Sequence, residues 1–253
     1  PLIPVSNISF KELIPYAEKL AKRVSETLSI PIYLYEYAAK EEKRKNLANI
    51  RSGEYEGLKE KISKKEWKPD FGLAFNKKSG ATAIGVRDFL IAYNINLNTK
   101  STRLANAIAF DVREKGRIKR KGHPVIGDIV YDKNGNPEKI PGSLKHVKAI
   151  GWYIDEFGIA QISMNLTNVT ETPIHTVFDE VSKKAEIRGA RVTGSELVGL
   201  IPLKSMLDAG KYFLKKQNRS IGIPEIDIIK VAIESLGLNQ VKNFDPETNI
   251  IEY

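Results

Sequence analysis

The chain has 253 residues, 42% hydrophobic and 28% charged, which is enough apolar material for one large domain or two ordinary ones. It contains no cysteine, which excludes disulfides, thiolate nucleophiles and cysteine-ligated zinc, and no apolar run approaches the roughly 18 residues that span a membrane. The net charge of +9 calls for a polyanionic partner to be considered, but the basic residues are scattered without interleaved aromatic rings, which favours an ordinary Lys-rich surface. We therefore expect a cytoplasmic protein that binds neither nucleic acid nor a membrane.

The first 88 residues show a β-α-β pattern followed by charged segments. Strands are expected at residues 2–5 and 31–35, and between them a helix begins at Ser9. Ser9 and Glu12 have the spacing of a capping box, and apolar residues then recur at helical spacing. The remaining expectations are charged surface helices at residues 38–50 and 55–62 and a Gly-, Lys- and Asn-rich loop at residues 64–80.

The pattern is more regular from residue 89 onward. The expected elements are a strand at 89–97, a helix at 100–115 capped by Gly116, a long polar excursion at 117–143, a hairpin of strands at 147–154 and 160–166, a helix from Pro173 to Arg188, a strand at 191–194, and helices at 203–217 and 224–236. Thr172 is predicted as the N-cap of the second helix. Up to residue 194 this is β-α-β-β-α-β, the order of a ferredoxin-like unit with an antiparallel sheet.

The two parts of the chain differ in completeness. One or two strands with one helix cannot cover both faces of a stable layer. We therefore predict an α+β protein (an α/β sandwich) with two similar ferredoxin-like βαββαβ subdomains. They occupy residues 1–88 and 89–253, and a segment before Pro1 is expected to complete the first.

The three histidines are the first candidates for proton transfer. His123 lies in the polar excursion and His146 at the start of a strand, and both are interpreted as structural. His175 falls in the first turn of a helix, where its pKa should be low and where a role near an anion competes with a packing role. No His pair or acidic cluster has metal-ligand spacing, so no metal is expected.

The stretch GLAFNKKSGATAIG, residues 72–85, is the best candidate for a ligand-binding loop. Its glycines allow close backbone approach, and Lys77 and Lys78 can meet carboxylates or phosphates. It has neither P-loop nor dinucleotide-binding spacing, so an ordinary flexible loop stays an alternative.

Polar residues also alternate along a strand that is otherwise apolar. Asn94 and Asn96 share one face, and Asn165 on another strand is expected to meet them across the sheet. Buried amides need partners, so these residues form either a hydrogen-bonded core device or ligand contacts. Ser195, bracketed by glycines before a helix, lacks the spacing of a nucleophile elbow, and no catalytic triad is expected.

Long blocks of the sequence resemble the glutamate formiminotransferase family in its single-function form. The blocks are IPIYLYEYAA, GATAIGVRDFLIAYNINLNT, LKHVKAIGWYIDEFGIAQISMNLTN, TGSELVGLIPLKSMLDAGKYF and PETNIIEY. The resemblance runs from Pro1 to Tyr253 and implies two similar subdomains that face each other across a folate-holding groove.

The resemblance implies transfer of a formimino group between N-formimino-glutamate and tetrahydrofolate, in histidine degradation and one-carbon metabolism. Tetrahydrofolate is then a co-substrate, and the family suggests a homodimer. Leu73 stands where a proline is usual in the family. The folate contacts are expected at Gly72, Leu73, Ala74, Phe75, Asn76, Lys77, Lys78, Ser79 and Gly80, and possible substrate-lining residues are Asn94, Asn96, Asn165 and His175.

The family's acid/base histidine belongs to a His-Pro-Arg block that would precede Pro1. We therefore expect no catalytic residue in this chain, and we expect it to bind folate but to transfer poorly. Three alternatives are an enzyme handling 5-formyltetrahydrofolate on the same scaffold, a non-catalytic folate-binding subunit and, most distantly, a basic RNA-binding protein.

Overall fold

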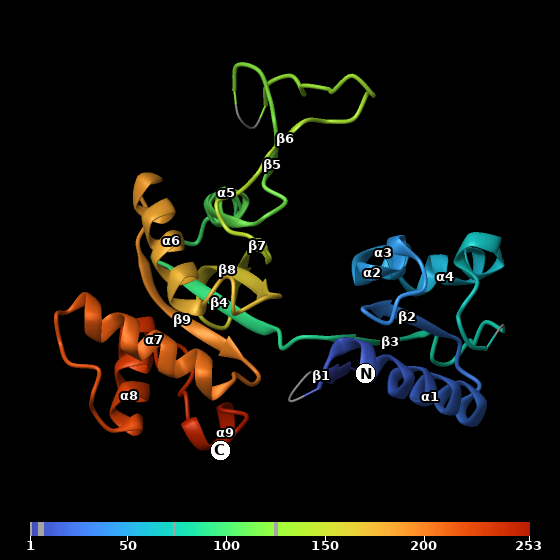
Figure 1. Cartoon of the computed structure of the whole chain (residues 1–253). Helices are drawn as coiled ribbons and strands as arrows, with labels where there is room; N and C mark the ends of the chain where they lie inside the picture. The colour runs from blue at the N-terminus through green and yellow to red at the C-terminus, as the bar shows by residue number, and fades with distance from the viewer. Residues whose placement is uncertain (1, 5–7, 73, 124–125) are drawn as a thin grey trace. The chain divides into compact units, whose positions relative to one another are not determined.

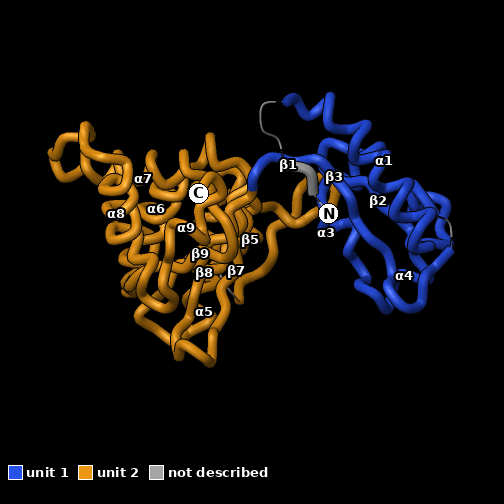
Figure 2. Tube along the Cα trace, turned by 90° about the horizontal axis from the view of Figure 1, so that it is seen from below, with its two compact units in different colours: residues 1–89 blue, residues 90–253 orange. Residues whose placement is uncertain are grey.

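The computed structural model describes residues 2–4, 8–72, 74–123 and 126–253. The chain divides into two compact units, unit 1 (Pro1–Phe89) and unit 2 (Leu90–Tyr253), coloured separately in Figure 2. Among the described residues, no helix is long and apolar enough to cross a membrane. Each unit has its own hydrophobic core.

Unit 1 is built on a small parallel sheet (Figure 1). Its strands lie in the order β1 (Leu2–Pro4), β3 (Thr82–Arg87) and β2 (Ile32–Glu36). Helix α1 (Phe10–Leu28) covers one face, and its predicted capping box is confirmed: Glu12 N–H donates to the Ser9 hydroxyl and Ser9 N–H donates to the Glu12 carboxylate.

The other face of this sheet is covered by short helices. They are α2 (Glu42–Lys45), α3 (Leu47–Arg51), α4 (Glu54–Ser63) and the 3₁₀ turn η1 (Lys65–Trp67). Along β2, Ile32 and Leu34 pack in the α1-side core, while Tyr33 and Tyr35 pack in the cluster formed with α3 and α4. The single helix expected at residues 38–50 is wrong, because the chain breaks at Asn46, whose side chain caps α3.

The sequence interpretation of unit 1 missed its central strand. The expected ligand-binding loop at residues 72–85 overlaps this strand: residues 82–85 open β3, which pairs in parallel with both β1 and β2. The strand was hidden because its residues continue a Gly-rich stretch. All three described strands are parallel, so the antiparallel pattern expected for the second subdomain is not repeated among them.

Unit 2 contains the predicted ferredoxin-like arrangement. Its antiparallel sheet has the order β7 (Val147–Ile154), β8 (Ile159–Leu166), β4 (Ile91–Leu97) and β9 (Val192–Val198). Helix α5 (Thr102–Val112) follows β4, and α6 (Ile174–Ile187) follows β8. Both helices contribute to the single core cluster of this unit, so they cover the sheet face that carries Tyr93 and Ile95. The βαββαβ order and the α+β class are confirmed.

Three local predictions in unit 2 are wrong. Helix α5 ends at Val112 with Arg113 as its C-cap, so Gly116 lies beyond the helix. Thr172 is not the N-cap of α6; Pro173 is, and the Thr172 hydroxyl instead donates to the Lys145 carbonyl at 2.8 Å. The closing strand β9 continues to Val198, beyond the predicted residue 194.

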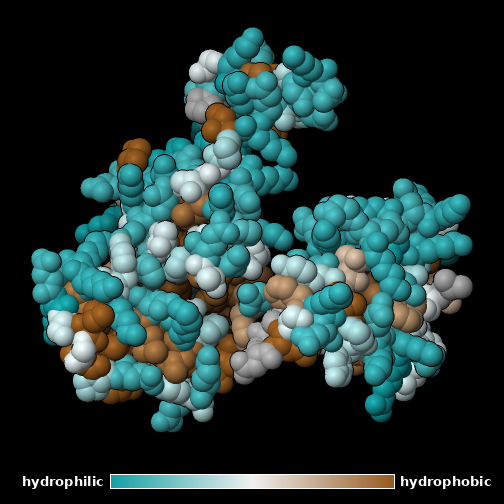
Figure 3. Space-filling model, viewed as in Figure 1, coloured by the Kyte–Doolittle hydropathy of each residue, from teal (hydrophilic) through white to brown (hydrophobic). Residues whose placement is uncertain are grey.

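The rest of unit 2 consists of the polar excursion and the C-terminal helices. The polar excursion contains the small hairpin β5 (Arg117–Ile118) and β6 (Lys139–Ile140), and it is mostly hydrophilic on the face seen in Figure 3. The C-terminal part forms α7 (Leu203–Lys216), α8 (Glu225–Leu236) and α9 (Pro246–Asn249), of which α7 and α8 add apolar residues to the core.

Candidate functional site

The predicted ligand loop of unit 1 is fixed at both of its ends. On the incoming side, Asp70 N–H donates to the Ile32 carbonyl and Ile32 N–H donates to the Phe71 carbonyl, both at 2.8 Å. On the outgoing side, Thr82 N–H donates to the Pro31 carbonyl at 3.0 Å. Residues 72–81 therefore leave and rejoin the start of β2, so the loop is closed on the sheet.

A buried ion pair fixes the incoming end further. Arg44 is 3% exposed, and its guanidinium contacts the Asp70 carboxylate at 3.1 Å and the Lys68 carbonyl at 2.8 Å. The same carboxylate oxygen accepts from Leu34 N–H at 2.8 Å. Because a buried charge pair that loses one partner is strongly destabilising, this pair holds residues 68–70 firmly against β2.

Asn76 organises the tip of the loop. Its side-chain amide donates to the Ser29 carbonyl at 3.0 Å, and its side-chain oxygen accepts from the Lys78 and Ser79 N–H groups at 2.9 and 3.1 Å. Gly80 N–H donates to the Asn76 carbonyl at 2.8 Å. These bonds form a tight turn of the kind that asparagine side chains stabilise.

The loop leaves its charged side chains exposed. Lys77 and Lys78 are both exposed, and neither forms an ion pair with an acidic residue in the part of the chain that the structure describes. The backbone below them is nevertheless held, because the Tyr55 hydroxyl donates to the Lys77 carbonyl at 2.6 Å. Two ammonium groups on a fixed backbone suit recognition of carboxylates.

The other residues of the predicted loop differ in conformation and exposure. Gly72 and Gly80 both have φ of +68°, Ala74 and Ser79 are exposed, Phe75 is half-buried against Tyr55, and Leu73 lies outside the described residues. A Cβ at Gly72 would lie 2.5 Å from the Ser25 hydroxyl oxygen, and one at Gly80 would lie 3.2 Å from the Tyr55 ring. Both positions therefore favour glycine for their positive φ, and Gly72 favours it for space as well.

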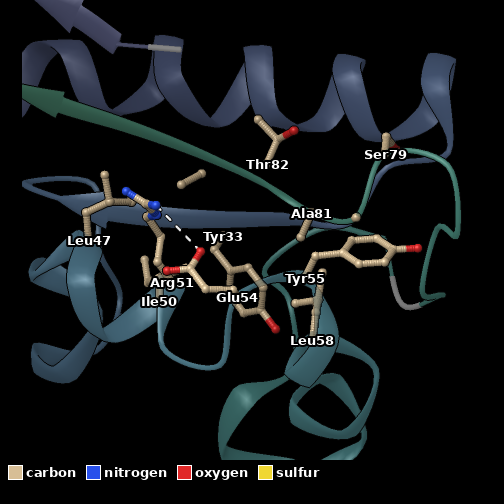
Figure 4. Close-up of a pocket in the computed structure, with 12 residues that line it drawn as sticks. Tyr33, Leu47, Ile50, Arg51, Glu54, Tyr55, Leu58, Ser79, Ala81 and Thr82 are labelled. Carbon is tan, nitrogen blue, oxygen red and sulfur yellow. Dashed lines mark ion pairs between the residues drawn. The ribbon is translucent and has the colours of Figure 1, made fainter. Parts of the chain in front are cut away.

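A cavity of about 300 Å³ opens beside the outgoing end of the loop (Figure 4). Tyr33, Tyr55 and the apolar side chains of α3 and α4 form its walls, and residues 79–83 pass along it. Arg51 and Glu54 form a 3.5 Å ion pair at its edge. Aromatic and aliphatic walls with a few polar groups are typical of sites for small organic ligands.

Tyr33 contributes a neutral phenol to this cavity wall. Burial raises its pKa to about 12, an effect opposed by the nearby Arg44 and reinforced by Asp70. Its hydroxyl donates to the Trp67 carbonyl at 2.5 Å. Tyr33 therefore acts as a wall and as an anchor for the segment that precedes the loop, and its hydroxyl is not available for acid–base work near neutral pH.

In unit 2, the predicted asparagines lie on the sheet face opposite α5 and α6. Asn94 and Asn96 are 3% and 0% exposed, and strand alternation separates them from the core residues Tyr93 and Ile95. Asn94 donates to the Glu196 carboxylate at 3.1 Å, and Asn96 donates to the Gln240 side chain at 2.7 Å. Both amides thus have protein partners.

Gln161 is the centre of this polar network, and the sequence interpretation missed it. Its side-chain nitrogen donates to Asn96 at 2.7 Å and to Glu196 at 3.3 Å, while its oxygen accepts from the Trp152 indole at 3.1 Å. Gln161 lies directly opposite Asn96 in the sheet. The period-2 sequence Gln161, Ser163, Asn165 was the available signal.

Asn165 does not join this network directly. It pairs in register with Ala92, whereas Ser163 faces Asn94. Asn165 is exposed, and no hydrogen bond of its side chain is present among the described residues. Asn165 therefore lies on the same sheet face as the network but is exposed.

His175 lies in the other layer of unit 2, between helices. Its ring stacks on Tyr212 of α7 at 4.4 Å, and its buried Nδ1 has no hydrogen-bond partner in the part of the chain that is described. Burial lowers its pKa, although Asp208 and Asp179 oppose this effect. The structure does not bring His175 together with Asn94 and Asn96, because it contacts α7 and not the network face.

Among the remaining candidates, His146 and Ser195 make structural contacts. His146 has a φ of +55° and its Nε2 lies 2.9 Å from the Glu171 carboxylate. His123 lines a groove beside α5. The Ser195 hydroxyl is fully buried and donates to the Leu236 carbonyl at 2.6 Å, so it is not placed to act as a nucleophile. Among the described residues, no group of three or more His, Cys, Asp or Glu could hold a metal ion.

The fold and the loop define an α+β protein. Unit 2 is ferredoxin-like, and unit 1 carries an anchored loop with two lysines. Family models match both units: residues 1–87 match the N-terminal subdomain of the formiminotransferase domain, and residues 92–253 match the formiminotransferase domain itself. The chain belongs to the formiminotransferase family.

Several relatives are similar over much or all of the chain. It is 46% identical to a formimidoyltransferase-cyclodeaminase from Dictyostelium discoideum and 45% identical to one from Gallus gallus, in each case covering 100% of the chain and 43% of the relative. It is 38% identical to a glutamate formimidoyltransferase from Thermoplasma acidophilum, covering 85% of the chain and 63% of that protein. The chain thus spans less than half the length of the two bifunctional relatives.

Proposed function

We propose that the chain carries the folate-binding part of a glutamate formimidoyltransferase, which moves a formimino group between N-formimino-glutamate and tetrahydrofolate. The observation that carries the proposal is the family match over both units, which includes the anchored loop of unit 1. The names of the relatives support the same transfer reaction.

The reaction is a substitution at the formimino carbon. The N5 amine of tetrahydrofolate attacks that carbon, a tetrahedral intermediate forms, and the bond to the glutamate nitrogen breaks after that nitrogen is protonated. The proton lost by N5 balances the one gained by the departing glutamate amine. A general acid/base and the alignment of two substrates are therefore the main requirements of catalysis.

We assign folate binding to residues 72–80 and to the adjoining cavity. Lys77 and Lys78 would bind carboxylates of the folate tail or of glutamate, and the Tyr33 and Tyr55 walls would accept an aromatic ring. The hydrogen bonds of Asn76 support this role, because they fix the backbone before ligand arrives.

We assign the proton transfer to none of the three histidines of this chain. His146 is paired with Glu171, and the stacked His175 ring lies in a helix-packing contact.

Asn94 and Asn96 remain proposed substrate-lining residues, although both already have protein partners. Asn165 lies on the same face and is exposed, so its side chain needs no rearrangement to meet a ligand.

The proposal also includes a cytoplasmic homodimer that uses tetrahydrofolate as co-substrate and no metal. The absence of cysteine supports the compartment, since cytosolic proteins do not depend on disulfides. Size-exclusion chromatography with light scattering tests the dimer: a species of one chain mass at working concentrations would contradict it.

An assay of the full-length gene product tests the activity. We expect glutamate release from N-formimino-glutamate to depend on tetrahydrofolate, and we expect no turnover when 5-formyltetrahydrofolate is supplied as the only one-carbon donor. Turnover of 5-formyltetrahydrofolate alone would favour the other enzyme on this scaffold. Tight tetrahydrofolate binding without either turnover would favour a non-catalytic binding subunit.

A further inference from the structure

Unit 2 contains a second basic site that the proposed function does not use. A groove of about 860 Å³ runs along α5 beside the β5–β6 hairpin, and we call it the arginine groove. Its lining includes five arginines: Arg103, Arg113, Arg117, Arg120 and Arg188. Its volume lies within the roughly 300–1,000 Å³ range of sites that bind small molecules.

The choice of basic residue in the arginine groove is selective. The chain has eleven arginines and 29 lysines, yet the described lining of the groove holds five of the arginines and none of the lysines. An unselected basic surface of this chain would be mostly lysine. Arginine is the residue that binds phosphate and carboxylate with a planar, two-pronged donor fork.

The positive charge of the groove is only partly neutralised. Among the described residues, Asp111 is the one carboxylate that pairs with these five guanidinium groups; it contacts Arg117, and it lies 2.5 Å from Arg188. No acidic residue is among the described groove-lining residues. Arg117 and Arg188 share this one carboxylate, so the five guanidinium groups leave a local excess of positive charge that an anion would relieve.

Several of the guanidinium groups are held in place with donors to spare. Arg113 donates to the Gly116 and Ala149 carbonyls and lies over the Phe110 ring at 4.0 Å. Burial and the charge of Arg117 lower the pKa of Arg113, as expected for neighbouring like charges. Each guanidinium has five N–H donors, and these bonds use only two of those of Arg113.

Two further arginines of the groove have donors without a partner among the described residues. Arg120 donates through Nη1 to the Gly127 carbonyl at 2.7 Å, and its other donors have no partner among the described residues. Arg103 is exposed and forms no hydrogen bond or ion pair in the described part of the chain. Between the arginines, Leu104, Phe110 and Ile118 supply apolar surface.

We propose that the arginine groove binds a small multivalent oxyanion, a molecule with at least two phosphate or carboxylate groups beside an apolar part. Charged groups would meet the arginine forks, and the apolar part would lie on the side chains between them. The site lies wholly in unit 2 and shares no residue with the folate loop of unit 1, so it goes beyond the proposed function.

Isothermal titration of the full chain with inorganic pyrophosphate and with citrate tests this proposal. We expect at least one probe to bind at low salt, and its identity distinguishes phosphate from carboxylate recognition. The double variant Arg103→Gln/Arg120→Gln should weaken that binding about tenfold or more, because two charge-assisted contacts are lost. Arg103→Lys/Arg120→Lys should recover only part of the loss, since lysine restores charge without the fork.

The matched control is Lys215→Gln/Arg219→Gln, which removes two exposed positive charges elsewhere in unit 2. We expect it to keep wild-type probe affinity, and we expect the groove variant to keep wild-type tetrahydrofolate affinity. Four results would overturn the proposal: no binding of either probe by the wild type, an equal loss in the control, a parallel loss of tetrahydrofolate affinity, or tighter binding of a single-stranded oligonucleotide than of both probes.

Discussion

The ligand loop of unit 1 and the polar network of unit 2 use the same residue types in opposite ways. In the loop, the Asn76 side chain forms hydrogen bonds with backbone groups, and the charged groups of Lys77 and Lys78 stay exposed. In the network, the side chains of Asn96 and Gln161 form a hydrogen bond with each other, and both residues are completely buried.

The difference indicates what each arrangement is suited to do. A fixed backbone with unpaired charges is ready for a ligand, because little ordering is left to be done on binding. A buried network in which each amide already has a partner contributes to the fold, because an orphaned buried polar group costs about 1–3 kcal/mol. We therefore expect loop variants to change mainly affinity and network variants to change mainly stability.

Gln161→Leu should give the largest effect. The change removes the donor to Asn96 and the acceptor of the Trp152 indole, so we expect a loss of roughly 3 kcal/mol in the free energy of unfolding, measured by urea denaturation. Asn165→Ala on the same strand, at an exposed position, is the control and should change stability by less than about 0.5 kcal/mol. Equal effects of the two would show that the network does not stabilise the fold.

Gly72→Ala should have the next largest effect, and it should lower both stability and folate affinity. The residue has a φ of +68°, and the added Cβ would lie 2.5 Å from the Ser25 hydroxyl, so we expect a loss of about 2 kcal/mol together with weaker folate binding. Gly57→Ala in α4 is the matched control, because its new Cβ would have no atom within 4 Å other than those of its chain neighbours and its own helix backbone. We expect the control to be neutral or slightly stabilising; a harmless Gly72→Ala would contradict the anchored loop.

His175 should have the smallest effect, visible only through pH. Burial lowers its folded-state pKa, with Asp208 and Asp179 opposing the effect, so the unfolded chain binds more protons. Its contribution to stability is therefore present above the unfolded pKa of about 6.5 and is lost as the pH falls through the folded value. Thermal unfolding from neutral to mildly acidic pH should show this loss in the wild type and a flatter profile in His175→Leu. A steeper profile in the variant would reverse the assignment.

The sequence predicted the topology of unit 2 because its strands and helices have clear periodicities and good turn signals. It failed at β3, where glycines and small residues conceal a strand that only its neighbours β1 and β2 define. The capping box at Ser9 was predictable because both partners are local. The prediction of Thr172 as a helix cap failed because its hydroxyl donates to the carbonyl of Lys145, which is distant in sequence.

The same distinction between local and distant contacts applies to the sites. The loop could be proposed from one continuous segment, although its anchors at Ser29 and Ile32 could not. Gln161 and Gln240 were missed because their importance depends on meeting Asn96 from other parts of the chain. The arginine groove likewise joins α5 to Arg188, 77 positions beyond Asp111, and no linear spacing indicates it.

The proposed function depends most directly on folate binding by the loop at residues 72–80 through Lys77 and Lys78. Isothermal titration of tetrahydrofolate into Lys77→Ala/Lys78→Ala tests it, with Lys59→Ala/Lys65→Ala, two exposed lysines of the same unit, as the control of equal charge. A charge-assisted bond is worth about 1.5–3 kcal/mol when shielded and less when exposed, so we expect affinity to fall about tenfold in the loop variant and to stay at the wild-type value in the control. Unchanged tetrahydrofolate affinity in the loop variant would contradict the account.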